Sequence, residues 1–189
     1  MKIETATIIC LLVGLSLLSG CASLTTPTYS PHYETIDLLK KRDIEKMSVG
    51  EVQPHDPSAP VNQITLRGTP LSSSNGTFAS YLENALRSDL KEMRLYDPTS
   101  TMRVDATILK NDIDISGFGT GYGVMEVKLA INKKGILAFE KVYLANTQFE
   151  SSFAGAVAIP KGQNEYPNLV RALLQKVYSD PTFIEAVKK

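Results

Sequence analysis

Cys21 is the residue with the clearest chemical potential in this sequence. It follows two small residues, Ser19 and Gly20, and an apolar stretch that runs from Ala6 to Leu18 behind the single cation Lys2. A cysteine thiol is a nucleophile that can accept a diacylglyceryl group, and small residues before it let the backbone enter the site of a membrane-embedded peptidase. The stretch is shorter than the about 20 apolar residues of a membrane-spanning helix, and it is typical of a signal peptide.

The sequence Leu18-Ser19-Gly20-Cys21 resembles the lipobox of bacterial lipoproteins. The resemblance implies that residues 1–20 are a signal peptide, and that Cys21 carries an S-diacylglycerol and an N-acyl chain, which together hold a protein durably on a membrane. Because Ala22 and Ser23 lack the aspartate that retains enterobacterial lipoproteins in the inner membrane, it also implies the periplasmic face of the outer membrane. The alternative is a signal sequence that is uncleaved or ordinarily cleaved, with a cysteine there by chance.

The composition bounds the remainder of the chain. Cleavage before Cys21 leaves about 169 residues, enough for one domain with its own core. Since Cys10 lies in the removed segment and Cys21 is acylated in this interpretation, no thiol remains for a disulfide. Lys and Arg number 20, as do Asp and Glu, and this balance argues against a nucleic-acid partner, which requires a basic face.

Side chains that could support catalysis or hold a metal are sparse. The two histidines, His32 and His55, fall in a proline-rich region, where side chains are seldom held firmly enough for acid–base or nucleophilic chemistry. Two isolated histidines without a cysteine do not predict a zinc site. The sequence therefore predicts a protein that is not an enzyme, with neither metal nor cofactor beyond the lipid on Cys21.

A run of alternating glycines from Gly117 to Gly123 contains two aromatic residues, Phe118 and Tyr122. Its spacing matches neither common phosphate-binding glycine motif, and it lies between predicted strands, with no helix N-terminus to receive a phosphate. Two interpretations remain: a hairpin turn, or a contact loop that presents Phe118 and Tyr122 to a partner.

Residues 21–60 are rich in Ser, Thr and Pro, which predicts a tether between the anchor and the domain. Within it, the segment from Tyr33 to Met47 places apolar residues loosely at helical spacing. A short helix that docks on the domain is therefore possible there.

Residues 61–189 carry the periodicities of a single α+β domain. We predict a two-layer sandwich in which a mainly antiparallel sheet of about four strands has two helices packed on one face, in the order strand, helix, three strands, helix. A slip in the alternation near Lys110 predicts a β-bulge. The predicted elements are a strand at Val61–Arg67, a helix at Phe78–Met93, strands at Met102–Ile115, Met125–Ile131 and Ile136–Phe149, a helix at Tyr166–Tyr178, and a last short helix opened by Asp180-Pro181.

This order behind a lipobox resembles the YajG-type family of small α/β envelope lipoproteins. The residues that carry the resemblance are the helix Phe78–Met93, the strand Val104–Ile115 with its glycine turn, the segment Phe149–Ala156 and the ending Asp180–Ile184. The resemblance implies a membrane-anchored domain and supplies no catalytic residue.

Residues Ser152 to Ile159 form an apolar stretch that ordinary solvated loops do not have. One interpretation is a buried extended segment or edge strand, with Phe153 and Ile159 in the core. The other is an exposed patch that binds a partner or a lipid, for which Ala156, Val157 and Ala158 are the candidates.

These observations favour an outer-membrane-anchored periplasmic protein that acts as a non-catalytic accessory or scaffold in an envelope assembly or transport system, bound to an envelope protein. The alternative is a lipid- or glycan-binding module with an apolar groove between helices and sheet. Such a groove would favour the binding module, whereas a filled core with one apolar surface patch would favour the scaffold.

Overall fold

The computed structural model of the chain describes residues 24–189. The predicted signal peptide and Cys21, with Leu18, Ser19 and Gly20, lie outside these residues. The elements are β1 (Leu24–Thr25), α2 (Tyr33–Lys40), β2 (Ser48–Gln53), a 3-10 turn (Pro60–Asn62), β3 (Ile64–Leu66), β4 (Thr69–Ser72), α3 (Phe78–Glu92), β5 (Met102–Asp114), β6 (Thr120–Lys133), β7 (Ile136–Glu150), α4 (Gly155–Ser179) and α5 (Pro181–Ala186).

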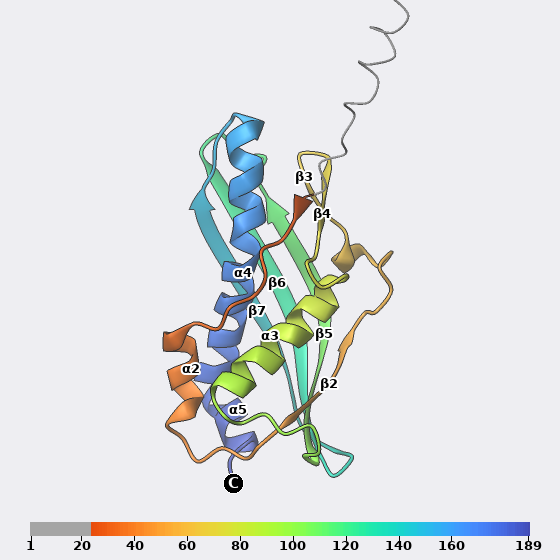
Figure 1. Cartoon of the computed structure of the whole chain (residues 1–189), viewed down its shortest axis with the longest axis vertical. Helices are drawn as coiled ribbons and strands as arrows, with labels where there is room; N and C mark the ends of the chain where they lie inside the picture. Colours follow the sequence, from red (N-terminus) through yellow and green to blue (C-terminus); the bar gives the residue numbers. More distant parts are fainter. Residues whose placement is uncertain (1–23) are drawn as a thin grey trace, which may run out of the picture.

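The architecture is mixed α+β with two sheets (Figure 1). The main sheet has four strands in the order β2-β5-β6-β7, in which β5, β6 and β7 form an antiparallel meander and β2 pairs with β5 in parallel. The small sheet has the order β1-β4-β3. Helices α3 and α4 lie over one face of the main sheet, as predicted. The predicted first strand, Val61–Arg67, is wrong as a member of this sheet: its residues Ile64–Leu66 form β3 of the small sheet, and β2 pairs with β5 in its place. The small sheet was not predicted.

The meander follows the alternation in the sequence. Inward-facing residues of β6, such as Val127 and Leu129, are buried, while the residues between them are partly open to solvent. The register of β5 against β6 shifts between Ile108 and Lys110, which confirms the predicted bulge. A two-residue turn at Lys134 and Gly135, both with positive φ, connects β6 to β7.

Side-chain caps mark where α3 and α5 begin. The Thr77 side chain accepts a hydrogen bond from the Ser80 amide at the start of α3. Asp180 caps α5 by accepting from the Thr182 amide, and Pro181 occupies the first helical position, as the sequence predicts. Helix α4 begins at Gly155, eleven residues before the predicted start at Tyr166, and continues through Pro160 and Pro167, each of which lacks the amide for one helical hydrogen bond.

The tether predicted for residues 21–60 is wrong for its described part, because residues 24–60 are folded into the domain. Helix α2 contributes the buried Ile36 and Leu39, and β2 contributes the buried Val49 and Val52. Pro27, Pro31, Pro54 and Pro57 occupy the connections and Pro60 opens the 3-10 turn, so none of them interrupts a strand or helix of this segment. This segment therefore supplies one strand of the main sheet and part of the core.

A buried polar group joins the same N-terminal segment to the helices. The Asp89 side chain on α3 is fully buried, and the Tyr29 hydroxyl donates to both of its carboxylate oxygens at 3.0 Å. The Arg171 guanidinium of α4 lies 5.8 Å from the Tyr29 ring centroid, and its Nε donates to the Ser30 carbonyl at 3.1 Å. Residues 29 and 30 are thus held by both α3 and α4.

Candidate contact site

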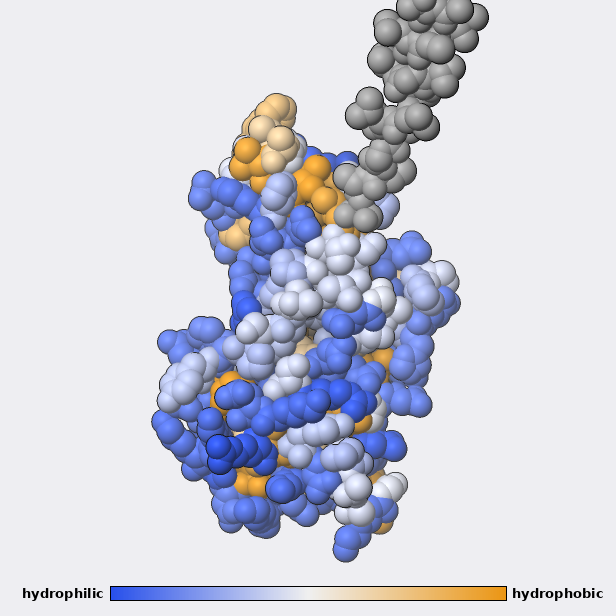
Figure 2. All heavy atoms as spheres, viewed as in Figure 1, coloured by the Kyte–Doolittle hydropathy of each residue, from blue (hydrophilic) through white to orange (hydrophobic). Residues whose placement is uncertain are grey.

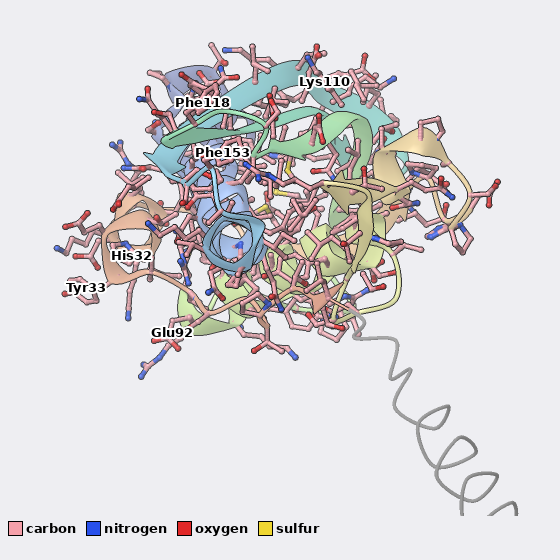
Figure 3. The ribbon with its side chains drawn as sticks, turned by 90° about the horizontal axis from the view of Figure 1, so that it is seen from above. His32, Tyr33, Glu92, Lys110, Phe118 and Phe153 are labelled. Carbon is pink, nitrogen blue, oxygen red and sulfur yellow. The ribbon has the colours of Figure 1, made fainter. Side chains whose placement is uncertain are left out.

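An exposed apolar cluster lies at one end of the molecule. It consists of Phe118, Phe153 and Val157, whose exposed fractions are 81%, 69% and 44%, and it is called the apolar tip below. The two phenylalanine rings stack with centroids 5.3 Å apart and planes at 12°. Figure 2 shows a hydrophobic area at this end, over the start of α4, and Figure 3 shows Phe118 and Phe153 side by side there.

Two loops bring these residues together. Phe118 lies in the β5–β6 loop, and Phe153 lies in the β7–α4 connection one turn before Val157. The Ser151 amide donates to the Gly119 carbonyl at 2.9 Å, which joins the two loops. The Ser116 amide donates to the Asp114 carboxylate, and this hydrogen bond holds the pKa of that carboxyl below its usual value.

Arg67 fixes the base of the apolar tip. It occupies the two-residue turn between β3 and β4 with φ of 51°. Its guanidinium donates to the carbonyls of Ile115, Ser152 and Phe153 and lies 6.0 Å from the Phe153 ring centroid. Sequence reasoning missed this residue. The Arg67-Gly68 dipeptide between two short strands predicts a turn. It does not predict that the Arg67 side chain binds carbonyls about fifty and eighty-five residues away in the chain.

Arg67→Gln is expected to loosen both loops and leave the global stability nearly unchanged. Because the side chain is exposed, its hydrogen bonds to the loop carbonyls contribute only about 1 kcal/mol, mostly to local order. Hydrogen exchange should accelerate at the amides of residues 116–119 and 151–155. Arg103→Gln, on the exposed face of the main sheet, is the control and should leave these amides unchanged. Equal exchange in both variants would contradict this role for Arg67.

The structure separates the residues that were predicted as contacts. Phe118, Ala156 and Val157 are exposed, and Tyr122, 52% exposed, lies on the face of β6 turned away from the helices. Ala158 is fully buried, so the prediction of a contact role for it is wrong.

The predicted burial of Phe153 is also wrong, whereas Ile159 is partly buried. Both errors have the same cause: the segment is not extended, and α4 starts at Gly155. With helical spacing, Ala158 and Gly162 face the sheet while Ala156 and Val157 face solvent.

Close packing fills the space between helices and sheet. A Cβ atom at Gly162 of α4 would lie 2.9 Å from Ile115, and one at Gly123 of β6 would lie 2.6 Å from Thr147 and 3.3 Å from Leu169. The two glycines let the helix approach the strands closely. Gly121 and Gly123 belong to β6, so only the first part of the glycine run forms the loop.

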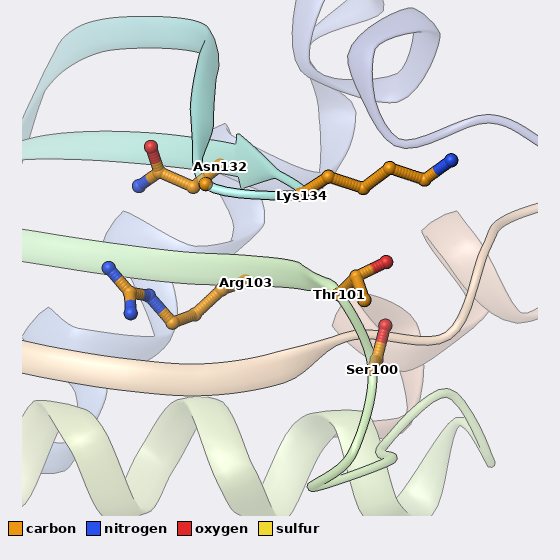
Figure 4. Close-up of a pocket in the computed structure, with 6 residues that line it drawn as sticks. Ser100, Thr101, Arg103, Asn132 and Lys134 are labelled. Atoms are coloured by element: carbon orange, nitrogen blue, oxygen red, sulfur yellow. The ribbon is translucent and has the colours of Figure 1, made fainter.

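Surface hollows lie both near the apolar tip and away from it. One hollow of about 260 Å³ lies near the β6–β7 hairpin and is lined by Ser100, Thr101, Arg103, Asn132, Lys134 and Gly135 (Figure 4). His32 precedes α2, and His55 lies in the loop after β2. Within residues 24–189, no three His, Cys, Asp or Glu side chains are grouped to hold a metal ion.

No helix within this same part of the chain is long and apolar enough to cross a membrane. Neither a protein-family model nor a curated protein sequence matches the chain. The fold is similar to that of a Xanthomonas campestris protein of the DUF330 family, with a TM-score of 0.53, 8% identity, and coverage of 88% of this chain and 95% of that one. At this identity the similarity concerns the fold alone.

Two weaker structural similarities are to proteins whose names include the word lipoprotein. A candidate lipoprotein from Caulobacter crescentus has a TM-score of 0.42 and 15% identity over 56% of this chain and 83% of that one. A minor lipoprotein from Acinetobacter baumannii has a TM-score of 0.38 and 11% identity over 77% and 92% of the two chains. These scores are too low to support a functional argument, and the resemblance to the YajG-type family is not confirmed.

Proposed function

We propose that this chain is a lipoprotein of the outer membrane, anchored through acylated Cys21 on the periplasmic face, which serves an envelope assembly or transport system as a non-catalytic accessory or scaffold. The anchor rests on the sequence Leu18-Ser19-Gly20-Cys21. The observation that carries the accessory role is an exposed apolar surface on the open face of the main sheet, where Tyr122, Val142 and Leu144 are each 46% or more exposed, on a domain whose core is filled.

The filled core also weighs against a lipid- or glycan-binding module. Such a module needs a groove between helices and sheet, yet inward-facing residues of both layers, such as Leu129 of β6 and Leu173 of α4, are at most 2% exposed. A hollow near the apolar tip, lined in part by Thr65, Arg67, Asp112 and Asp114, is polar and is not suited to an acyl chain.

Cys21→Ala is expected to abolish acylation and leave uncleaved precursor, because no other residue near the cleavage site offers a thiol. Metabolic labelling with a clickable palmitate analogue measures this. Cys10→Ala, within the predicted signal peptide, is the matched control and should keep the label. Label retained on Cys21→Ala would show that the lipid-anchor proposal is wrong.

The accessory role predicts a protein neighbour in the envelope. Tyr122 is an exposed aromatic residue on the open face of the main sheet, so a photo-crosslinking residue placed there in intact cells should capture a discrete protein adduct. The same residue at Lys134, exposed in the β6–β7 turn, is the control. Adducts that are identical at both positions, or absent from both, would contradict the accessory role at this surface.

A further inference from the structure

We propose that the apolar tip lies in the interface of the same bilayer that holds the acyl chains of Cys21, so that the membrane itself covers Phe118, Phe153 and Val157. This inference rests on the proposed lipid anchor. It assigns the tip to a lipid surface, and it leaves the open face of the main sheet, including Tyr122, for protein contacts.

The direction in which the chain enters the domain places the anchor at this end. Strand β1 runs parallel to β4, with Leu24 opposite Leu71, and β4 begins directly after the turn that contains Arg67. Arg67 binds the carbonyls at the base of the apolar tip. The polypeptide therefore enters β1 from the side of the tip, and Figure 1 shows β1, the β3–β4 hairpin and the start of α4 at the same end of the molecule.

The length of the connecting chain limits how far the membrane can be. Three peptide steps separate Cys21 from Leu24, a distance of about 11 Å at full extension. Thr25 accepts a hydrogen bond from Gln163 of α4 at 2.6 Å, and Gln163 lies about 12 Å along the helix from Gly155. These two distances are nearly equal, so the lipid on Cys21 can reach the level of the apolar tip along the axis of α4 but little beyond it.

The chemistry of the tip suits a bilayer interface. Its exposed atoms are two aromatic rings and an aliphatic side chain, and the neighbouring cations Arg67 and Lys161 lie beside it, the latter paired with Glu150 at 3.1 Å. Apolar side chains that enter the headgroup region next to an acyl anchor add a second attachment point. Two attachment points fix the orientation of the domain, with its C-terminal end directed away from the membrane.

The chain contains no tryptophan, so a single introduced tryptophan reports on its own position. Phe153→Trp and Phe118→Trp place it in the apolar tip. Ile136→Trp is the control: Ile136 is 72% exposed at the β6–β7 hairpin, about 40 Å away along the 14-residue strand β6. The acylated full-length proteins are reconstituted into phosphatidylethanolamine and phosphatidylglycerol vesicles, with and without brominated acyl chains.

Tryptophan at position 153 or 118 should emit at shorter wavelength when the protein is bound to vesicles than when the protein has been released from its anchor into detergent-free buffer. Brominated lipid should quench most of this tryptophan emission. Tryptophan at 136 should show neither effect. Protein that floats with the vesicles while tip and control tryptophans stay equally unquenched would overturn this inference and leave the anchor intact. Protein that carries no acyl group and does not float would instead show that the anchor proposal is wrong.

Discussion

Val52→Asp is expected to destabilise the protein by about 3 kcal/mol or more, because it places an unpaired carboxylate in the core. Val52 is fully buried on β2, where it pairs with Ala106 of the central strand β5. This loss of stability is several times larger than that caused by an ordinary surface substitution.

A chain that starts at Pro60 should lose still more stability, because it lacks β2 and the buried face of α2 together. We expect no cooperative unfolding transition from it.

His55→Asp is the matched control for Val52→Asp. It introduces the same carboxylate three residues later, on an exposed loop, and should change stability by about 0.5 kcal/mol or less. Urea denaturation followed by circular dichroism compares the two variants. If residues 24–60 were a tether in solution, the two substitutions would have equally small effects, and the chain that starts at Pro60 would unfold cooperatively.

The strands of the meander and the two long helices could be predicted from the sequence because their burial is periodic. In β5, Val104, Ala106 and Ile108 alternate with polar residues, and the phase slip at Lys110 marks the bulge. In α3, apolar residues recur at helical spacing behind a capping threonine. Local patterns of this kind require no knowledge of distant partners.

Strand β2 could not be predicted in the same way. Its alternation is broken by a register shift between Val49 and Val52, and Gly50 and the two prolines that follow the strand, Pro54 and Pro57, are typical of loops. Its partner β5 begins about fifty residues later in the chain. Parallel pairing over that distance leaves no local signal, so composition alone predicted a tether there.

The candidate site could be predicted only where its residues lie in a local sequence pattern. The glycine run indicated either a hairpin turn or a contact loop that presents Phe118 and Tyr122, because glycine patterns are local. The position of Phe153 depends on where α4 begins, and Pro160 obscured that start. The role of Arg67 depends entirely on carbonyls brought near it by the tertiary fold.

The buried Asp89 side chain predicts an unusual dependence of stability on pH. Burial raises the pKa of Asp89 to about 7, although the hydroxyls of Tyr29 and Tyr178 and the charge of Arg171 oppose the shift. An unfolded chain has an ordinary aspartate pKa of about 4. Between these two values the folded protein keeps a proton that the unfolded chain has lost. The free energy of unfolding therefore falls as pH rises through this range, and it levels out above pH 7.

Asp89→Asn is expected to remove this dependence, because the amide does not titrate and its oxygen can still accept from the Tyr29 hydroxyl. The difference in free energy of unfolding between the variant and the unsubstituted protein should shift in favour of the variant by up to about 3 kcal/mol from pH 5 to pH 8. Urea denaturation at both pH values measures this shift.

Asp180→Asn is the control. Burial alone would raise the pKa of Asp180, but hydrogen bonds from Lys141, Tyr143 and Thr182 hold it well below its usual value. Its contribution to stability is therefore complete above pH 5, so that variant should be destabilised equally at both pH values. A constant difference for Asp89→Asn as well would mean that Asp89 is already ionised in the folded protein at pH 5.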